Sequence, residues 1–518
     1  MDQLVIPQIL IEASEKYPAQ GIWADNEFTP YPEVLAQVMQ LARALSQKGI
    51  RKGSVVGVLD VNSLYHLELH YALGFLGAII HPLNFRLSLN DLEYTVRLAK
   101  DEWLFFGPEF ASLGHSLKGL VPRQILMGKE FSGLMSQGMP AAPDLSLKET
   151  DPYSVCFTTG TTGRPKAALY RHRDLVLTSW QIVHHMALHD TPARLGMNEV
   201  ILPLIPFFHM HGWGIPFMAP YIGASVVLAG KVSPASQAKL IYRHGVTWSS
   251  MVPTQLQALL KTLTEPLSEP LKVLTGGTAV TSGLAHRAEQ LQIALSVIYG
   301  GADQLGSAIS AVPPHTALSS VDRSLILTAR VLPLPAVEMT VRDQNGHTLP
   351  PDGLSTGEIW IRSPWLPQGY FKNPQASQSS YRDGYFVSGD LGIGFPDGTF
   401  AVVDRLSEAV KIGDEWIPTH FLETMISDIE GIEQVAVLPL ISPQWGDRPV
   451  AVIQTHQPIE PEAITTYLQT QAEAGRIRQF WIPERIFYIA KMPLTSAGKI
   501  NKQTLVAKLD QLPEYPMA

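Results

Sequence analysis

The N-terminal part of the chain alternates between apolar runs and segments with apolar residues at helical spacing. The helical spacing before residue 50 is set by Leu35, Val38, Met39, Leu41, Ala42 and Leu45. The pattern predicts a helical region over residues 1–50, a helix over 63–76 and buried strands over 55–59 and 78–83. Strands that alternate with helices in this way predict a parallel sheet covered by helices.

The same alternation returns in the middle of the chain. The segments 226–228, 248–252 and 272–277 predict strands, and the segments 235–242 and from Thr254 onward predict helices between them. Two regions of this kind predict an α/β fold with doubly wound sheets.

Beyond about residue 320 the pattern changes to short strands separated by Gly/Asp turns at 343–346, 351–353 and 396–398. This pattern of short strands and turns predicts a small β-rich subdomain. After residues 402–405 the chain returns to an α/β pattern. We therefore expect a large N-terminal domain over residues 1–403 and a small α/β C-terminal domain over residues 404–518.

Length and composition restrict the class of protein. With 518 residues the chain exceeds the roughly 250–300 residues of one hydrophobic core, so at least two domains are expected. A net charge of −8 argues against a nucleic-acid partner. The single cysteine, Cys156, excludes an internal disulfide and is interpreted as a buried structural thiol. The N-terminus lacks a signal-peptide pattern and the apolar segment 72–80 is too short to span a membrane, so we expect a cytoplasmic protein.

A Gly/Thr-rich stretch between the apolar runs 155–157 and 167–170 is the strongest chemical signal in the sequence. Strand, tight loop and strand predict a β-hairpin. Glycines let backbone N–H groups converge on one point, and threonine hydroxyls and cations complete a loop suited to a polyphosphate. An ordinary solvated turn is the alternative. The loop residues are Thr158, Thr159, Gly160, Thr161, Thr162, Gly163, Arg164 and Lys166.

Four further segments that carry candidate functional residues follow this loop along the chain. They are Tyr-Gly-Gly-Ala-Asp at 299–303, Gly-Tyr-Phe-Val-Ser-Gly-Asp at 384–390, Asp-Arg at 404–405 and Pro-Leu-Thr-Ser-Ala-Gly-Lys at 493–499. Together with the loop, they resemble the motifs of the adenylate-forming (AMP-binding) superfamily of acyl-CoA synthetases, luciferases and adenylation domains. The resemblance covers essentially the whole chain.

The resemblance implies roles for individual residues. The loop threonines, Gly160, Gly163 and Lys166 would hold the ATP phosphates, and Asp390 would accept hydrogen bonds from the ribose hydroxyls. Arg405 would lie near the ribose or the phosphates, and Lys499 would bridge the carboxylate and the α-phosphate. The remaining implied nucleotide contacts are Gly276, Gly277, Thr278, Tyr299, Gly300, Gly301 and Ala302, with Asp303 toward Mg²⁺ and Asp404 as the hinge between domains.

Other segments concern the acyl group and its acceptor. Residues 83–87, 208–213 and 413–417 resemble the fatty-acyl-CoA synthetase branch, in which His209 would gate the acyl pocket. A metal pair of His209 and His211 is disfavoured because no cysteine or carboxylate cluster accompanies them. Lys411, Gly413, Asp414 and Trp416 would line the acceptor channel. Phe207, Phe208, Trp213, Ile215 and Phe217 are interpreted equally as acyl-pocket wall or as core.

The sequence departs from the superfamily motifs in two places. Ala302-Asp303 replaces Thr-Glu, which shortens the carboxylate side chain that faces Mg²⁺ by one methylene. Asp414 replaces a glycine in the acceptor channel, where only glycine permits close approach to backbone. The second departure bears on the acceptor rather than on activation of the acid.

These observations lead to three hypotheses. The first is ATP-dependent activation of a carboxylic acid as acyl-AMP with release of pyrophosphate, then transfer to CoA. The second passes the adenylate to an amine or amino acid and forms an amide, as in coronafacate-ligase-type members. The third is a non-catalytic adenylate-binding protein. The expected partners are ATP, Mg²⁺, an acid with an apolar acyl group, and CoA or an amine, with homodimer formation left open.

Overall fold

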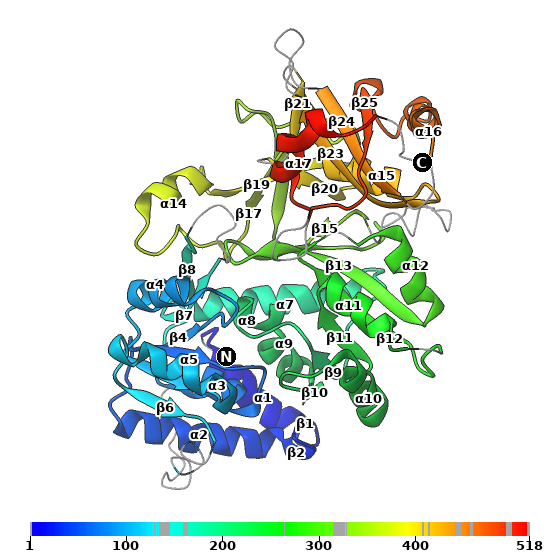
Figure 1. The fold of residues 1–518 in the computed structure, drawn as a ribbon. Helices are drawn as coiled ribbons and strands as arrows, with labels where there is room; N and C mark the ends of the chain where they lie inside the picture. The colour runs from blue at the N-terminus through cyan, green and yellow to red at the C-terminus, as the bar shows by residue number, and fades with distance from the viewer. Residues whose placement is uncertain are drawn as a thin grey trace.

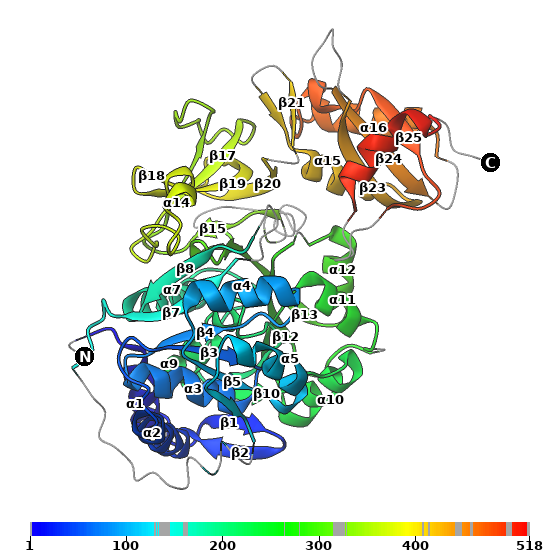
Figure 2. The ribbon, with the colours of Figure 1, turned by 60° about the vertical axis from the view of Figure 1, so that its left-hand side comes forward.

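The computed structural model describes most of the chain (Figure 1). The described residues are 3–128, 131, 133, 146–158, 164–263, 265–278, 280–313, 327, 329–406, 409–412, 415–440, 448–455, 459–493 and 500–514. The C-terminal part, coloured orange to red, lies at one end of the larger N-terminal part, and strands β17 (Thr356–Arg362) and β19 (Tyr385–Gly394) lie beside it at the same end (Figures 1 and 2).

A nine-stranded sheet forms one half of the N-terminal part. Its inner strands are parallel, whereas β1–β2 at one end and β13–β14–β15 at the other are antiparallel. In spatial order the strands are β15 (Leu332–Pro333), β14 (Leu305–Ile309), β13 (Ile293–Gly301), β12 (Leu271–Gly276), β11 (Trp248–Met251), β9 (Val200–Pro203), β10 (Ser225–Leu228), β1 (Gly21–Ala24) and β2 (Glu27–Pro30).

A six-stranded sheet forms the other half. It is parallel except for the hairpin of its last two strands. In spatial order the strands are β6 (Gln124–Leu126), β5 (Trp103–Phe106), β3 (Val55–Leu59), β4 (Ile79–Pro82), β7 (Pro152–Phe157) and β8 (Ala167–Arg171). The hairpin predicted around the Gly/Thr-rich loop is therefore confirmed.

Helices cover both sheets, as expected for a doubly wound fold. The largest apolar core lies between the sheets and includes α1 (Ile6–Lys16), α2 (Tyr31–Gln47), α3 (Leu64–Phe75), α7 (His172–Leu188) and α9 (Ile215–Ile222). A second core joins the nine-stranded sheet to α10 (Pro234–His244), α11 (Pro253–Leu260) and α12 (Ser282–Gln290). A third joins the six-stranded sheet to α4 (Leu89–Ala99) and to the segment that contains α5 (Ala111–Ser116).

The remaining sheets follow the predicted change of texture. An antiparallel sheet contains β16 (Glu338–Arg342), β17 (Thr356–Arg362), β19 (Tyr385–Gly394), β18 (Tyr381–Arg382) and β20 (Phe400–Arg405), with α14 (Pro374–Ser380) nearby. The C-terminal part contains the hairpin β21 (Val410–Ile412) and β22 (Glu415–Ile417), the sheet β23 (Ile432–Leu440), β24 (Arg448–Thr455) and β25 (Arg485–Tyr488), and helices α15 (Thr419–Ser427), α16 (Pro461–Glu473) and α17 (Lys502–Lys508).

One expectation is wrong and one boundary stays a prediction. Residues 1–50 are not uniformly helical, because the hairpin β1–β2 lies between α1 and α2 and its strand β1 completes the nine-stranded sheet. Leu391 and Val403, before residue 404, share one apolar core with Val410 and Leu422 after it. This shared core therefore extends across the domain boundary expected between residues 403 and 404, and that boundary stays a prediction.

Candidate active site

Three β-hairpins from three sheets meet at one place: β7–β8, β13–β14 and β19–β20. Tyr299 on β13 donates a hydrogen bond to Asp390 on β19 (2.7 Å). Tyr170 on β8 donates to the carbonyl of Ala302, in the turn between β13 and β14. Phe371, before α14, donates its N–H to Ala167 on β8 (2.7 Å). The predicted phosphate, nucleotide and ribose segments are therefore in contact around one centre.

Asp390 is a buried carboxylate with two strong partners. Its side chain accepts from the Tyr299 hydroxyl, and Arg405 Nη1 lies 2.8 Å from its Oδ1. Asp390 and Arg405 are directly opposite in the β19–β20 ladder, so the sheet register fixes their pairing. Burial raises the pKa of Asp390, and the charge of Arg405 and the Tyr299 hydrogen bond oppose that rise.

Asp303 lies beside the cation that ends the phosphate loop. Burial raises its pKa, while a hydrogen bond from Tyr370 and the charge of Lys166 lower it. Lys166 Nζ is 4.9 Å from the centre of the Tyr370 ring. Asp303 Oδ1 is buried and has no hydrogen-bond partner among the described residues. An unpaired carboxylate oxygen beside a phosphate loop fits Mg²⁺, which uses one or two carboxylates together with substrate phosphates.

The phosphate loop is closed at its base by two hydrogen bonds. The Thr158 N–H donates to the Lys166 carbonyl (2.9 Å), and the Lys166 N–H donates to Thr158 Oγ1 (3.0 Å). This pair continues the β7–β8 ladder and holds both ends of the loop at the site. Thr159, Gly160, Thr161, Thr162 and Gly163 lie outside the described residues.

Two glycines let backbone segments approach closely. A Cβ on Gly276, the last residue of β12, would lie 2.6 Å from the Ile298 carbonyl oxygen. A Cβ on Gly300 would lie 2.3 Å from the Leu305 carbonyl oxygen. Both positions therefore require glycine. The exposed backbone of Gly277 and Thr278 follows β12, while Gly301 and Ala302 continue from β13 toward Asp303.

The segment after β9 contains a left-handed turn. Met210, His211, Gly212, Trp213 and Gly214 all have positive φ, between 43° and 84°. The first four form the short element α8 (Met210–Trp213). Each non-glycine residue in this conformation costs about 1–2 kcal/mol, so the surroundings must stabilise the turn. Such strain is frequent at functional sites.

The residues around this turn separate into two groups. Phe207, Ile215 and Phe217 belong to the main core and are at most 1% exposed. Trp213 is only partly buried, and its Cη2 lies 3.4 Å from the position of a Cβ on Gly276. Burial, with a smaller effect of the Arg86 charge, lowers the pKa of His209 to about 4, so its ring is neutral at pH 7. Trp213 therefore lies beside the end of β12, where the nucleotide segment begins.

The expected hinge and acceptor channel lie where the C-terminal part begins. The Asp404 carboxylate accepts from the Arg405 N–H (2.7 Å) and from the Thr419 hydroxyl. Lys411 and Trp416 are directly opposite each other in the β21–β22 hairpin. Gly413, Asp414 and the catalytic candidate Lys499 lie outside the described residues. Their roles stay predictions.

Three tyrosines were missed by the sequence reasoning. Tyr370 contacts Lys166 and Asp303, and Tyr381 donates to the Asp303 carbonyl (2.7 Å). Tyr170 holds Ala302 in the same way. They come from three separate segments, and only the glycine–aromatic sequence Gly369-Tyr370-Phe371 marks any of them as unusual.

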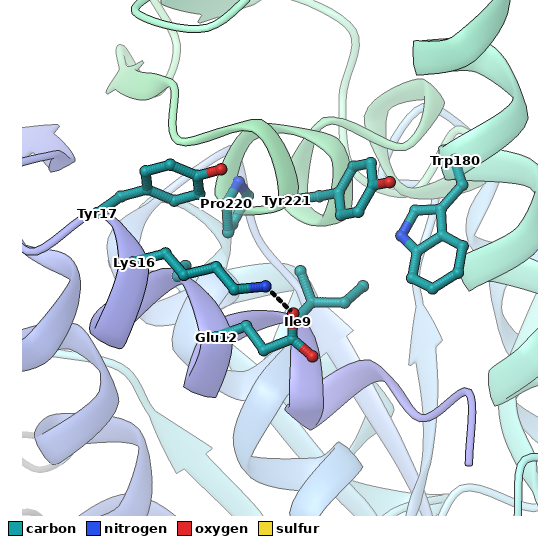
Figure 3. Close-up of a pocket in the computed structure, with 8 residues that line it drawn as sticks. Ile9, Glu12, Lys16, Tyr17, Trp180, Pro220 and Tyr221 are labelled. Carbon is teal, nitrogen blue, oxygen red and sulfur yellow. Dashed lines mark hydrogen bonds and ion pairs between the residues drawn. The ribbon is translucent and has the colours of Figure 1, made fainter. Parts of the chain in front are cut away.

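A separate surface pocket of about 30 Å³ lies among α1, α7 and α9 (Figure 3). Lys16 and Glu12 form an ion pair inside it (2.6 Å), and the rings of Trp180 and Tyr221 stack beside it (5.1 Å). This volume accommodates one or two water molecules. Within the described residues, no group of three or more His, Cys, Asp or Glu side chains suits a metal, and no helix suffices to cross a membrane.

Comparison with known proteins agrees with this arrangement. Residues 12–371 match the model of the AMP-binding enzyme family. The chain is 32% identical to a long-chain-fatty-acid–CoA ligase of Thermus thermophilus, over 92% of this chain and 89% of that protein. It is 29% identical to a medium-chain-fatty-acid–CoA ligase of Ectopseudomonas oleovorans, over 98% and 96%. The fold is similar to that of MatB from Rhodopseudomonas palustris (TM-score 0.82, 20% identity, 98% and 99% covered).

The chain therefore belongs to the AMP-binding enzyme family. It is an AMP-forming carboxylate ligase.

Proposed function

We propose that this enzyme activates a carboxylic acid with an apolar acyl group as acyl-AMP and then transfers the acyl group to CoA. The observation that supports this most strongly is the meeting of Asp390, Arg405, Asp303 and Lys166 around one centre. The similarity to fatty-acid–CoA ligases supports an apolar acid and a thiol acceptor.

In the first half-reaction, a carboxylate oxygen of the acid attacks the α-phosphorus of ATP, and the bond to the bridging oxygen of the β-phosphate breaks. Charge then moves onto the departing pyrophosphate. The Thr158–Lys166 loop holds the β- and γ-phosphates through backbone N–H groups, threonine hydroxyls and Lys166. Asp390 accepts from the ribose hydroxyls and so orients the α-phosphate toward the acid.

Lys499 is proposed to lie between the carboxylate and the α-phosphate during this step. Its charge offsets the repulsion between two anions and the charge that develops on phosphorus oxygens. Gly276, Gly277, Thr278 and Tyr299 border the adenine, with Gly300 and Gly301 beside it. Mg²⁺ held by Asp303 and the phosphates would neutralise charge on the pyrophosphate.

In the second half-reaction the CoA thiol loses its proton to solvent, the thiolate sulfur bonds to the acyl carbon, and the bond from that carbon to the phosphate oxygen breaks, so that AMP leaves with the electron pair. We propose that residues 404–518 rotate about Asp404 between the two steps. Lys499 and the Lys411–Trp416 hairpin belong to that one domain, yet they serve different half-reactions. Neutral His209 and the partly buried Trp213 border the acyl group.

Amide formation is the alternative, because Asp414 places a side chain where the acceptor channel of the superfamily has glycine. The test mixes the protein with ATP, Mg²⁺ and straight-chain acids, and adds either CoA or a mixture of amino acids. We expect an acyl-CoA thioester, AMP and pyrophosphate. If an amide forms and no thioester forms, the acceptor is an amine and not CoA.

The Lys499→Ala variant separates the half-reactions. We expect acid-dependent pyrophosphate exchange to fall at least about 100-fold, since this charge acts mainly in the adenylation transition state. The same variant should still convert synthetic acyl-AMP and CoA to thioester. Exchange at the wild-type rate would reject the proposed role of Lys499, and absence of exchange by the wild type with every acid would reject the proposed activity.

A further inference from the structure

A chain of buried side chains ends at the centre of the left-handed turn. His211 is the second residue of that turn, and both of its ring nitrogens have partners. Its Nδ1 is 2.8 Å from His70 Nε2, and its Nε2 is 2.8 Å from Ser154 Oγ. His70 Nδ1 is in turn 2.8 Å from the His66 carbonyl oxygen on α3.

The carbonyl at the end fixes the direction of every bond in the chain. A carbonyl only accepts, so His70 carries its proton on Nδ1 and accepts at Nε2. His211 must then donate from Nδ1 and accept at Nε2, where the Ser154 hydroxyl is the donor. One proton placement therefore satisfies all three bonds.

The surroundings keep both rings neutral, as this arrangement requires. His70, His211 and Ser154 are fully buried. Burial lowers the pKa of His70 to about 4 and that of His211 well below its ordinary range. The groups packed around His211 are the rings of Tyr153 and Phe217 and the Cys156 thiol, with His66 as the remaining ionisable neighbour.

The turn relates this buried chain to the site. Residues two positions apart in a helical turn of about 100° per residue point in nearly opposite directions. His211 is fully buried, whereas Trp213 is only partly buried at the edge of the same core, and its Cη2 lies 3.4 Å from the position of a Cβ on Gly276, at the end of β12. Ser154 lies on β7, four residues before Thr158. Its hydrogen bond to His211 therefore connects the left-handed turn to the strand that leads to the phosphate loop.

We propose that Ser154, His211 and His70 are positioning residues that hold the left-handed turn, and that they thereby set the shape of the acyl site at Trp213 and His209. This inference rests on the proposed function. It predicts that His70, which lies outside the proposed substrate contacts, influences which acids the enzyme accepts.

The test compares two substitutions at His70. Gln offers an amide oxygen as an acceptor for His211 Nδ1–H, whereas Leu has similar bulk and no acceptor. Pyrophosphate exchange is measured for each variant with straight-chain acids of increasing length. We expect His70→Leu to raise KM for the preferred acid at least tenfold and to change the preferred length, with KM for ATP within twofold. His70→Gln should stay within threefold of wild type for both substrates.

A folded His70→Leu protein with the wild-type KM for the acid and the wild-type preference for acid length would overturn the proposal. The proposal would also be overturned if His70→Gln raised KM for the acid as much as His70→Leu. If His70→Leu does not fold, Ser154→Ala removes only the terminal hydroxyl and should raise KM for the acid about threefold without changing KM for ATP; an unchanged KM overturns the proposal.

Nitrogen NMR of ¹⁵N-histidine protein provides a readout independent of activity. The proposal requires His70 and His211 to be neutral and protonated on Nδ1 at pH 7, and an Nε2-protonated His211 overturns it. Failure of the proposed function would instead be seen as absence of exchange by the wild type with every acid.

Discussion

Asp390 and Arg405 lie opposite each other on β19 and β20, with Arg405 Nη1 2.8 Å from Asp390 Oδ1. Arg405 immediately follows Asp404, and the Arg405 N–H donates to the Asp404 carboxylate. The cation that pairs with the proposed ribose ligand is therefore adjacent to the proposed pivot. The proposed rotation of residues 404–518 would therefore act on the nucleotide site through Arg405.

Replacing Asp390 by Asn should weaken ATP binding. The substitution removes the negative charge that pairs with Arg405 and accepts from Tyr299, and it weakens the contact to the ribose hydroxyls. Hydrogen bonds to charged groups contribute about 1.5–3 kcal/mol each, so KM for ATP should rise about 10- to 100-fold. Pyrophosphate exchange at varied ATP concentration measures this change.

Tyr299→Phe is the matched control, because it removes one donor to Asp390 and leaves the carboxylate in place. Its effect on KM for ATP should be smaller, about three- to tenfold. An Asp390→Asn enzyme with the wild-type KM for ATP would show that the ribose is bound elsewhere.

Replacing Asp303 by Asn should raise the requirement for Mg²⁺. The Oδ1 atom is buried and has no hydrogen-bond partner in the described part of the chain, and an amide is a weaker ligand for a hard cation than a carboxylate. We expect the half-saturating Mg²⁺ concentration in pyrophosphate exchange to rise at least tenfold. Asp383→Asn, at an exposed position between β18 and β19, should leave this concentration unchanged. If both variants have the same half-saturating Mg²⁺ concentration, Asp303 does not bind the metal.

Much of the fold could be predicted because its signals are local. The strand Val55–Leu59 and the helix that follows Ser63 occur where the apolar pattern places them, and Ser63 caps that helix by accepting from the His66 N–H. The hairpin β1–β2 also had a local signal that was missed. Asp25 and Asn26 both have positive φ, as a two-residue hairpin turn between short strands requires.

The left-handed turn could not be predicted from local sequence. Its partners His70 and Ser154 are 141 and 57 residues from His211, and no intrinsic preference favours positive φ at Met210 or Trp213. The candidate site shows the same division. Asp390 was identified because residues 384–390 resemble a superfamily motif, whereas Tyr370 and Tyr381 become recognisable only through their contacts with Asp303.

The pH dependence of stability should respond to Glu68 on α3. Burial raises its pKa to about 8, and Oε2 has no partner among the described residues. The folded chain keeps the carboxyl protonated up to about pH 8, whereas the unfolded chain loses the proton near its ordinary pKa of about 4.3. The folded state therefore binds more protons over this interval, and its stability falls as pH rises, by up to about 1.4 kcal/mol per pH unit.

Glu68→Gln should remove this contribution. Denaturant unfolding at pH 5 and at pH 8 should show a smaller loss of stability between the two pH values than in the wild type, with the variant more stable at pH 8. Burial also raises the pKa of Asp60, to about 7, and this contribution stays in both proteins. A variant with the pH slope of the wild type would show that Glu68 is ionised in the folded chain.

The hydrogen bond between Thr419 and the proposed hinge should stabilise the C-terminal part. Thr419 is fully buried, donates to the Asp404 carboxylate, and accepts from Lys502 Nζ (3.0 Å). Lys502 also pairs with Glu423 (2.8 Å). Thr419→Val keeps the side-chain volume but removes the hydroxyl, so a buried carboxylate loses a donor at a cost of about 1–3 kcal/mol. Thermal unfolding of the full chain should therefore show a lower Tm.

Thr466→Val tests whether a valine at any threonine of the C-terminal helices has this effect. Thr466 is exposed on α16, where its carbonyl, not its hydroxyl, accepts from Thr470. The Tm of that variant should match the wild type, since exposed substitutions usually change stability by less than about 0.5 kcal/mol. If the two variants have equal Tm values, the Thr419 hydroxyl does not stabilise the hinge. The other contacts of the buried Asp404 carboxylate would then suffice.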